Sequence, residues 1–483
     1  MELDLDEGFV VGNNEDYERE CADQTKKNIM SGVNRDMLPA KFSYIFLYLS
    51  IGCYHPYLIV FLKSIGISVS NAGVVAGIRM LVSCFASSCF NAIGDFTHRN
   101  MCIFWFLCIA STLMIFPLPW IVQDALSAVA RKNCSGDSFT GKTINKDTLM
   151  ANCHKNMLFF IMLAVNIVNA IFTQPIAPYL DPVVVALVKK KKNISFTQQR
   201  IFGAIGFGIG ALLAGIASDN LDPSGMPNYS AVFFIYLPSM IMLIISSLFL
   251  FKQYKAQRSG DGHSNNKNVG EQFVLIVKTC IKWRHFVFLL TILVVGAANG
   301  LLYLFTFLLL EELDASKTLM GFSILFLCVA ELIMFPLSEK IIKLCKGPYV
   351  CVLISVFSYF LRFMLYSLIH KPWLILPIQF LHSFGYALFW ESAFKIIEMT
   401  TPKKILLPML AFTQSLFFDF GFMIAFITGG FAYDRYKGKL LFRGASYIAL
   451  LWTAIMSIMF CFTLSDKKTC ERVDTEMELI TPS

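Results

Sequence analysis

Three ionisable side chains, Glu331, Arg362 and His382, stand within long apolar stretches of the sequence. A charge at the middle of a membrane-spanning helix costs about 2.5–3.5 kcal/mol, so it needs a partner, a cavity or a function. Low-dielectric surroundings favour the neutral form of a carboxylic acid, and a nearby guanidinium favours the ionised form. We therefore expect Glu331 to load and release a proton as it exchanges between Arg362 and solvent, with His382 as a relay. The alternative is a static Glu–Arg pair that holds two helices together.

Aromatic and polar side chains at helical spacing are candidates for lining a cavity. Tyr48 and His55 lie seven residues apart and share one stripe of a helix. His382, Tyr386 and Trp390 follow one another at intervals of four and share one face. On that face Trp390 would stack on the ring of a sugar or a base, and the alternative is ordinary packing.

Arg79, Asp181 and Asp419 complete the set of residues that we expect to contact a polar solute. Arg79 would bind an anionic group, or it would pair with Asp95 or Asp181. Asp181 stands next to prolines, where backbone carbonyls freed from helix hydrogen bonds would help to bind a cation or a polar solute. The alternative for Arg79 and Asp181 is structural pairing.

The elements that must position these residues are membrane-spanning helices. Of the 483 residues, 56% are hydrophobic and 15% are charged, whereas a soluble domain carries about a quarter charged residues. So much apolar surface must face lipid, which predicts an all-α integral membrane protein. Membrane topology accounts for the net charge of +8, so we expect no nucleic-acid partner.

Apolar runs long enough to cross a bilayer, about 20 residues each, occur twelve times. They are 42–62, 72–93, 101–122, 157–188, 201–218, 231–251, 286–310, 319–337, 350–369, 373–397, 409–431 and 447–464. A long polar loop divides them into two six-helix halves. The predicted segments are a tail (1–40), an N-terminal half (41–251) with a long outer loop (123–156), a central loop (252–284), a C-terminal half (285–464) and a second tail (465–483).

The distribution of basic residues predicts the orientation. Most of the 41 Lys and Arg lie on one side if both termini and the central loop are cytoplasmic. The glycosylation acceptors Asn133 and Asn228 then fall on outer loops. Cys134 and Cys153 fall in the long outer loop, where they form a disulfide or remain two free thiols.

A similar charge pattern follows the second and the eighth span. Asp95 is followed four residues later by Arg99, and Glu339 by Lys343. A repeat at equivalent places in both halves predicts an internal duplication, as in many transporters. The alternative for either copy is an ordinary solvated turn.

The fifth span is rich in glycine, with Gly203, Gly206 and Gly210 among others. Glycine destabilises an isolated helix, so a close helix contact must compensate. That contact is either static packing or a smooth surface for the rocking of the two halves.

The stretch from Pro175 to Pro182 (Pro-Ile-Ala-Pro-Tyr-Leu-Asp-Pro), followed by Arg200 to Gly206 (Arg-Ile-Phe-Gly-Ala-Ile-Gly), resembles the animal proteins called major facilitator superfamily domain-containing protein six. Further matches are Pro56, Gly66, Ile67, Ser68, Gly77, Ile78, Arg79, Glu331, Arg362, Tyr366, Pro372, Trp373, Leu381 and His382. The resemblance extends from about Lys41 to Gly430.

That family is similar to lactose permease and to bacterial nucleoside–proton symporters, so the resemblance implies proton-coupled solute transport by alternating access. Lactose permease places Glu, Arg and His in its eighth, ninth and tenth spans, and by resemblance Glu331, Arg362 and His382 take the proton-coupling roles.

The sequence departs from the family pattern at several positions. Gln379 stands where the family usually has an acid, and Ser383 where it usually has glycine. Asp419, Met423 and Ala425 occupy positions where the family is rich in glycine. These departures bear on the substrate and on the coupling.

We therefore expect a secondary active transporter, a proton symporter for a small polar solute such as a sugar or a nucleoside. The alternative is a receptor or scaffold that does not transport and that binds a protein partner through the outer loop 123–156. The sequence contains no Walker, zincin or serine-hydrolase motif, so we expect no enzyme activity, no cofactor and no metal.

The expected partners are the solute, protons and membrane lipids, and we expect a monomer. The basic run from Lys189 to Lys192 is typical of a contact with anionic lipids. The plasma membrane is the favoured location, and an endosomal membrane is the alternative.

Overall fold

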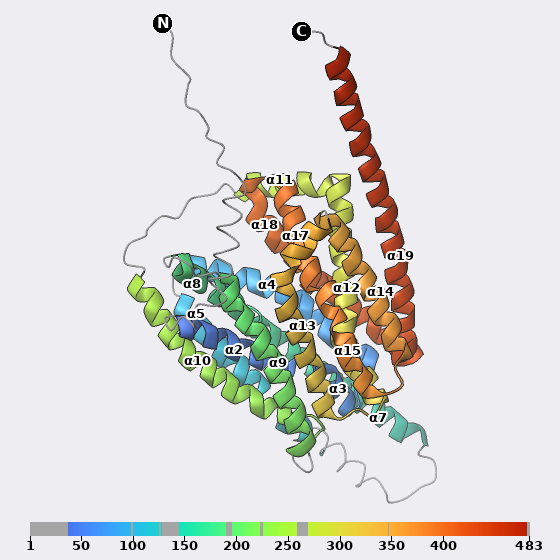
Figure 1. Ribbon diagram of the computed structural model, residues 1–483. Coiled ribbons are helices and arrows are strands. Elements are labelled where there is room, and N and C mark those ends of the chain that lie inside the picture. Colours follow the sequence, from blue (N-terminus) through green and yellow to red (C-terminus); the bar gives the residue numbers. More distant parts are fainter. Residues whose placement is uncertain are drawn as a thin grey trace, which may run out of the picture.

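The computed structural model describes residues 37–97, 100–124, 127, 144–189, 196–222, 226–257, 269–345 and 347–480. Every regular element in these ranges is a helix (Figure 1). The helices of the N-terminal half are α2 (Leu38–Tyr54), α3 (Leu58–Ser64), α4 (Val69–Thr97), α5 (Asn100–Ile115), α7 (Ile144–Thr173), α8 (Ile176–Lys189), α9 (Phe196–Asn220) and α10 (Ala231–Gln257).

The remaining elements belong to the central segment and the C-terminal half. They are α11 (Val269–Ile281), α12 (Trp283–Glu312), α13 (Lys317–Leu344), α14 (Pro348–Leu368), η2 (Pro372–Leu374), α15 (Ile375–Gln379), α16 (Leu381–Gly385), α17 (Ala387–Thr400), η3 (Lys403–Ile405), α18 (Leu406–Ser415), η4 (Leu416–Gly421) and α19 (Phe422–Ile480). α11 lies across one end of the C-terminal helices (Figure 1).

The helices are long and apolar enough for a multi-pass membrane protein, as predicted. Ten segments of the described chain qualify as spans, and a pair bent by 43°, Pro372–Gln379 with Leu381–Thr400, raises the number to 11. One of the ten, Lys403–Met459, covers both of the last two predicted spans. Its backbone leaves the helical region at Lys437, where φ is 62° and ψ is 174°. Twelve spans and cytoplasmic termini stay predictions.

Helical structure continues past several predicted span boundaries. α7 begins at Ile144, inside the predicted outer loop; α11 stands inside the predicted central loop; and α19 continues to Ile480. Hydropathy marks where a helix leaves the apolar layer, whereas backbone hydrogen bonding continues through polar residues, so the two boundaries differ.

Two helices of each half pack across the interface between the halves: α9 contacts α13, and α4 contacts α19. The predicted glycines of α9 lie on a different face. Gly206 and Gly210 leave room only for the backbone of α2 at Ile45 and Leu49, and Gly203 faces the ring of Tyr48. These three glycines therefore serve close packing within the N-terminal half.

The helices of the C-terminal half are irregular at two places that carry predicted site residues. The tenth predicted span is broken near Phe380 and again at Tyr386, rather than continuous. The residues Leu416–Gly421 form a π-helix, which contains Asp419. Single π-turns within α-helices occur frequently at functional sites.

Candidate functional site

The structure brings the three predicted proton-coupling residues together from three helices. Arg362 of α14 places Nη1 2.8 Å from Nδ1 of His382, and Nε2 of His382 lies 2.7 Å from Oε1 of Glu331 in α13. A guanidinium can only donate, so Nδ1 of His382 accepts and its ring proton is on Nε2. That N–H donates to the Glu331 carboxyl group. The imidazole therefore stands between the acid and the base, rather than beside a direct Glu–Arg pair.

Burial makes Glu331 the accessible end of this line. Arg362 is 2% exposed and the side chain of His382 is 5% exposed, whereas the side chain of Glu331 is 14% exposed. The carboxyl group is therefore the most accessible member of the line. A proton that enters there would change the charge of a group hydrogen-bonded to His382, and through it the surroundings of Arg362.

Neutral side chains hold the other side of Arg362. Its Nη2 donates to Oε1 of Gln379 and, at 3.2 Å, to the Tyr366 hydroxyl group. The Tyr366 hydroxyl group in turn donates to Gln379 over 3.1 Å. Because Gln379 is an uncharged amide, Glu331 is the carboxylate whose charge acts on Arg362 in this cluster.

The break in the tenth span positions His382. The backbone N–H of Tyr386 donates to the His382 carbonyl over 2.7 Å, and the two rings stack with centroids 5.1 Å apart at 11°. Gly385 allows α14 to approach, because a Cβ there would lie 3.0 Å from the ring of Tyr359. His382 and Tyr386 therefore lie on one face, as predicted, and their rings stack on each other.

Trp390 lies in an aromatic cluster rather than at an open surface. Its ring stacks on Phe418 at 5.8 Å and 11°, contacts Phe417 at 5.0 Å and is 4% exposed. This geometry agrees with the packing alternative. Asp419, next to Phe418 in the π-helix, has hydrogen-bonding contacts with Ser415 and with Cys84 of α4, so it joins the two halves.

Asp181 makes structural contacts within the N-terminal half. The Tyr44 hydroxyl group donates to Oδ1 over 2.6 Å, and Nη1 of Arg200 lies 3.6 Å from Oδ2. Tyr48 lies on the same side of α2, beside Arg200. Asp181 is therefore engaged by Tyr44 and Arg200, and it is not the partner of Arg79.

A second buried Arg–His pair stands in the N-terminal half. Nη2 of Arg79 lies 2.6 Å from Nε2 of His55, and Arg79 is 1% exposed. Asp95, the other expected partner, lies sixteen residues further along α4, a distance of about 24 Å in a helix. The alternative that pairs Arg79 with Asp95 or Asp181 is therefore not found among the described contacts, where Arg79 bonds to His55 instead.

The remaining predicted residues lie apart from these clusters. Glu339 and Lys343 form an exposed pair at 3.9 Å near the end of α13. Asn228 is exposed, as a glycosylation acceptor must be. Arg99, Asn133 and Cys134 lie outside the described residues, as do the side chains of Asp95 and Cys153.

Contacts between the halves gather at one end of the bundle, which the basic-residue distribution predicts to face outward and which we call the predicted outer end. Nζ of Lys63 lies 2.7 Å from Oε2 of Glu311, and Nζ of Lys317 lies 2.6 Å from Oδ2 of Asp222. The backbone N–H groups of Lys317 and Thr318 donate to Asp219. The sequence does not identify these residues, because charges at the ends of spans have the pattern of ordinary solvated residues.

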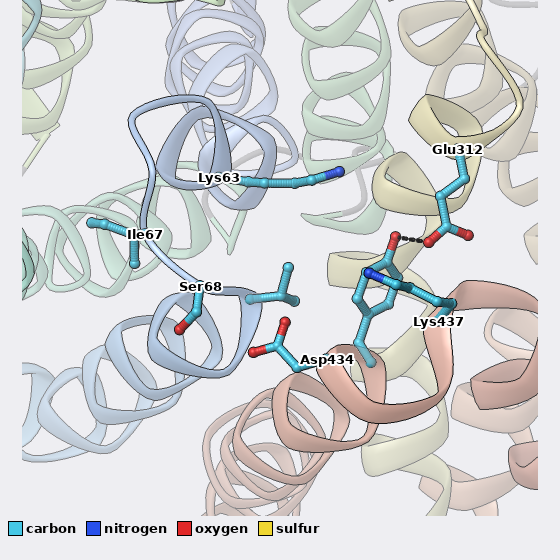
Figure 2. Close-up of a pocket in the computed structure, with 8 residues that line it drawn as sticks. Lys63, Ile67, Ser68, Glu312, Asp434 and Lys437 are labelled. Atoms are coloured by element: carbon cyan, nitrogen blue, oxygen red, sulfur yellow. Dashed lines mark hydrogen bonds between the residues drawn. The ribbon is translucent and has the colours of Figure 1, made fainter. Parts of the chain in front are cut away.

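A cavity of about 540 Å³ lies at this end between the halves. Figure 2 shows Lys63 and Ser68 of the N-terminal half facing Glu312, Asp434 and Lys437 of the C-terminal half. The Tyr433 hydroxyl group donates to Glu312 over 2.6 Å. The cavity therefore holds charges of both signs and borders the contacts that join the halves.

Comparisons with known proteins identify the family of the chain. The sequence is similar to major facilitator superfamily domain-containing protein 6-like protein B of Xenopus laevis, with 24% identity over 318 residues, 63% of this chain and 49% of that protein. The corresponding protein of Danio rerio is 22% identical over 54% of this chain and 46% of its own length. The chain thus spans about half the length of the curated relatives it matches. The resemblance noted in the sequence is confirmed.

Solved structures share the fold. The nucleoside transporter NupG has a TM-score of 0.65 at 12% identity and covers 88% of this chain and 99% of its own. A transporter of the POT family has a TM-score of 0.60 at 12% identity and covers 89% of this chain and 96% of its own. Residues 37–444 match the family described as MFS_1 like, so the chain belongs to the MFS_1 like family.

Proposed function

We propose that this protein is a secondary active transporter that couples the movement of a small polar solute to protons by alternating access. The hydrogen-bonded line Arg362–His382–Glu331 is the observation that carries the proposal. It joins three helices of one half, and its acid is the most accessible member.

Protonation of Glu331 is the step that links the proton to the conformation. The ionised carboxylate accepts the His382 N–H and offsets the charge of Arg362. The protonated acid loses that charge, so the contacts among α13, α14 and α16 weaken. A proton that binds more tightly in one conformation shifts the population toward it, which is the requirement for coupling.

Two features of the interface support alternating access. The α9–α13 and α4–α19 contacts run across the two halves, and the ion pairs at the predicted outer end hold that end together. Rocking of the halves would break those contacts and open the interface at the predicted outer end.

The test is solute-induced proton movement in proteoliposomes that contain the purified full chain. The panel comprises sugars, nucleosides and organic anions. We expect proton entry with one solute class, and we expect Glu331→Gln to lose proton entry and uphill accumulation but to keep solute exchange. Glu339→Gln is the matched control, because Glu339 belongs to an exposed pair remote from the line. Identical proton entry in wild type and Glu331→Gln would contradict the coupling role.

Folded protein that moves neither solute nor protons across this panel would favour the receptor alternative. The outer loop 123–156 would then be the segment to test for binding of a protein partner.

A further inference from the structure

Arg79 is a buried cation without a buried counter-charge. It is 1% exposed, and its described hydrogen-bond partner is the imidazole of His55. Because the guanidinium can only donate, Nε2 of His55 accepts, which makes this imidazole neutral. Among the residues whose side chains are described, no carboxylate pairs with Arg79, and its Nε has no hydrogen-bond partner. Arg362, by contrast, has Glu331 within electrostatic range.

An isolated buried charge is costly, and the cost falls when an opposite charge arrives. A pair that served only to fasten α2 to α4 would not require a cation, since two neutral polar residues satisfy each other more cheaply. The positive charge at this place therefore points to an occupant that brings a negative one.

The electrostatic neighbours of Arg79 include a residue of the other half. Three tyrosines lie within its electrostatic range: Tyr54, Tyr236 and Tyr303. The Tyr54 hydroxyl group donates to Asn166 over 3.0 Å, and the Tyr236 hydroxyl group bonds with that of Ser111 over 2.6 Å. Both hydroxyl groups are thus engaged within the N-terminal half.

Tyr303 differs from the other two tyrosines. It belongs to α12 of the C-terminal half, and its ring contacts Phe207 of α9 at 6.3 Å and Phe422 of α19 at 5.7 Å. Its hydroxyl group makes no hydrogen bond to any described residue. The free Tyr303 hydroxyl group of the C-terminal half therefore lies within electrostatic range of the unpaired Arg79 guanidinium group of the N-terminal half.

We propose that Arg79 and Tyr303 bind an anionic group of the transported solute, a carboxylate or a phosphate of a small organic acid. The inference rests on the proposed transport function and narrows its substrate class. An oxyanion accepts charge-assisted hydrogen bonds from the guanidinium group and a further bond from the phenol. His55 holds the guanidinium in place from behind.

The assignment fits proton coupling. One proton taken up by Glu331 and one carboxylate monoanion bound at Arg79 move together without net charge, whereas a phosphate monoester, with a charge of about −1.5 to −2 at pH 7, moves with net negative charge. A neutral sugar or nucleoside would leave the Arg79 charge unpaired during the crossing. The anion also bridges the halves, because Arg79 and Tyr303 come from opposite sides of the interface.

The test uses matched pairs of probes that differ in one acidic group. These are glucose with glucuronate and glucose 6-phosphate, and uridine with uridine monophosphate. Equilibrium binding to the purified full chain is measured separately from proton movement in proteoliposomes. We expect binding of at least one acidic member and none of its neutral parent. The carboxylate and phosphate arms distinguish the two anion chemistries.

Two variants test the residues. Tyr303→Phe removes one hydrogen bond to a charged group, worth about 1.5 kcal/mol or more, so the acid should bind at least about tenfold more weakly. Tyr54→Phe is the matched control, because its hydroxyl group is already engaged by Asn166, and it should keep wild-type affinity. Arg79→Gln should abolish binding of the acid, and Tyr303→Phe covers the case in which that variant does not fold.

The outcomes separate this inference from the proposed function. Selective binding of the acid without proton movement would support the anion site and overturn proton coupling. Binding of the neutral parents as tight as that of the acids, or no binding of any acid, would overturn the anion site. Proton entry driven by a neutral solute whose acidic counterpart does not bind would overturn the anion site and leave the transport function standing.

Discussion

Asp434 of the C-terminal half accepts a hydrogen bond from the backbone N–H of Ser70 in the N-terminal half, with 2.8 Å between Oδ2 and the nitrogen. Ser70 lies at the start of α4. The converse contact is made by Asp219 at the end of α9, which accepts from the N–H groups of Lys317 and Thr318 at 3.1 and 2.7 Å. Each half thus caps the first turn of a helix in the other. A carboxylate there satisfies free N–H groups and lies favourably against the helix dipole.

These reciprocal caps should hold the predicted outer end closed. Loss of a cap costs about 1 kcal/mol, so Asp219→Ala together with Asp434→Ala should shift the population toward the state open at that end by about tenfold or more. The measurement is labelling of a cysteine placed at the buried Leu62 by a membrane-impermeant maleimide. We expect faster labelling in the double variant.

Glu339→Ala is the control for this labelling, because Glu339 lies in an exposed pair outside the interface. Equal labelling rates in the double variant and the control would show that the caps do not set the closed state.

Charge in apolar runs marked Glu331, Arg362 and His382 as candidates in the sequence, and the family resemblance assigned them the proton-coupling roles. Their order in space was not predictable, because a rotation of 100° per residue fails where the tenth span breaks near Phe380. The break places the imidazole between the acid and the base. Asp219 and Asp434 were missed for another reason. A carboxylate in a polar turn gives no signal in the sequence that it will meet a helix from the other half.

Gln379 affects the charge balance of the hydrogen-bonded line Arg362–His382–Glu331. It accepts from Arg362 and from Tyr366 without adding a charge. Gln379→Glu would add a negative charge beside Arg362, which favours the protonated form of Glu331. We therefore expect the pH at which proton-coupled uptake is half-maximal to move upward. The pH profile of uptake in proteoliposomes is the measurement.

Gln379→Leu separates this charge effect from the loss of hydrogen bonds. It removes both bonds but adds no charge, so the upward shift should be absent. A shift of equal size in both variants would mean that packing around Arg362, rather than charge, determines the profile.

Two nearby glycines of α9 face different partners, so their substitution by alanine should have different effects on stability and on transport. Gly206 lies against the backbone of α2 at Ile45, within one half, whereas Gly208 faces Leu325 and Cys328 of α13 in the other half. Gly206→Ala should lower the free energy of unfolding by about 1–3 kcal/mol, because a backbone contact has no room to yield. A Cβ at Gly208 would lie 3.0 Å from the movable Cδ1 of Leu325 and 3.3 Å from the Cβ of Cys328 and the Cα of Leu325, so a small shift of α13 makes room for it. Gly208→Ala should therefore slow transport more than it lowers stability. Thermal unfolding and uptake rates measured on both variants check this.

If Gly208→Ala lost stability to the same extent and kept the wild-type rate, the α9–α13 surface would be static packing rather than the surface on which the halves move.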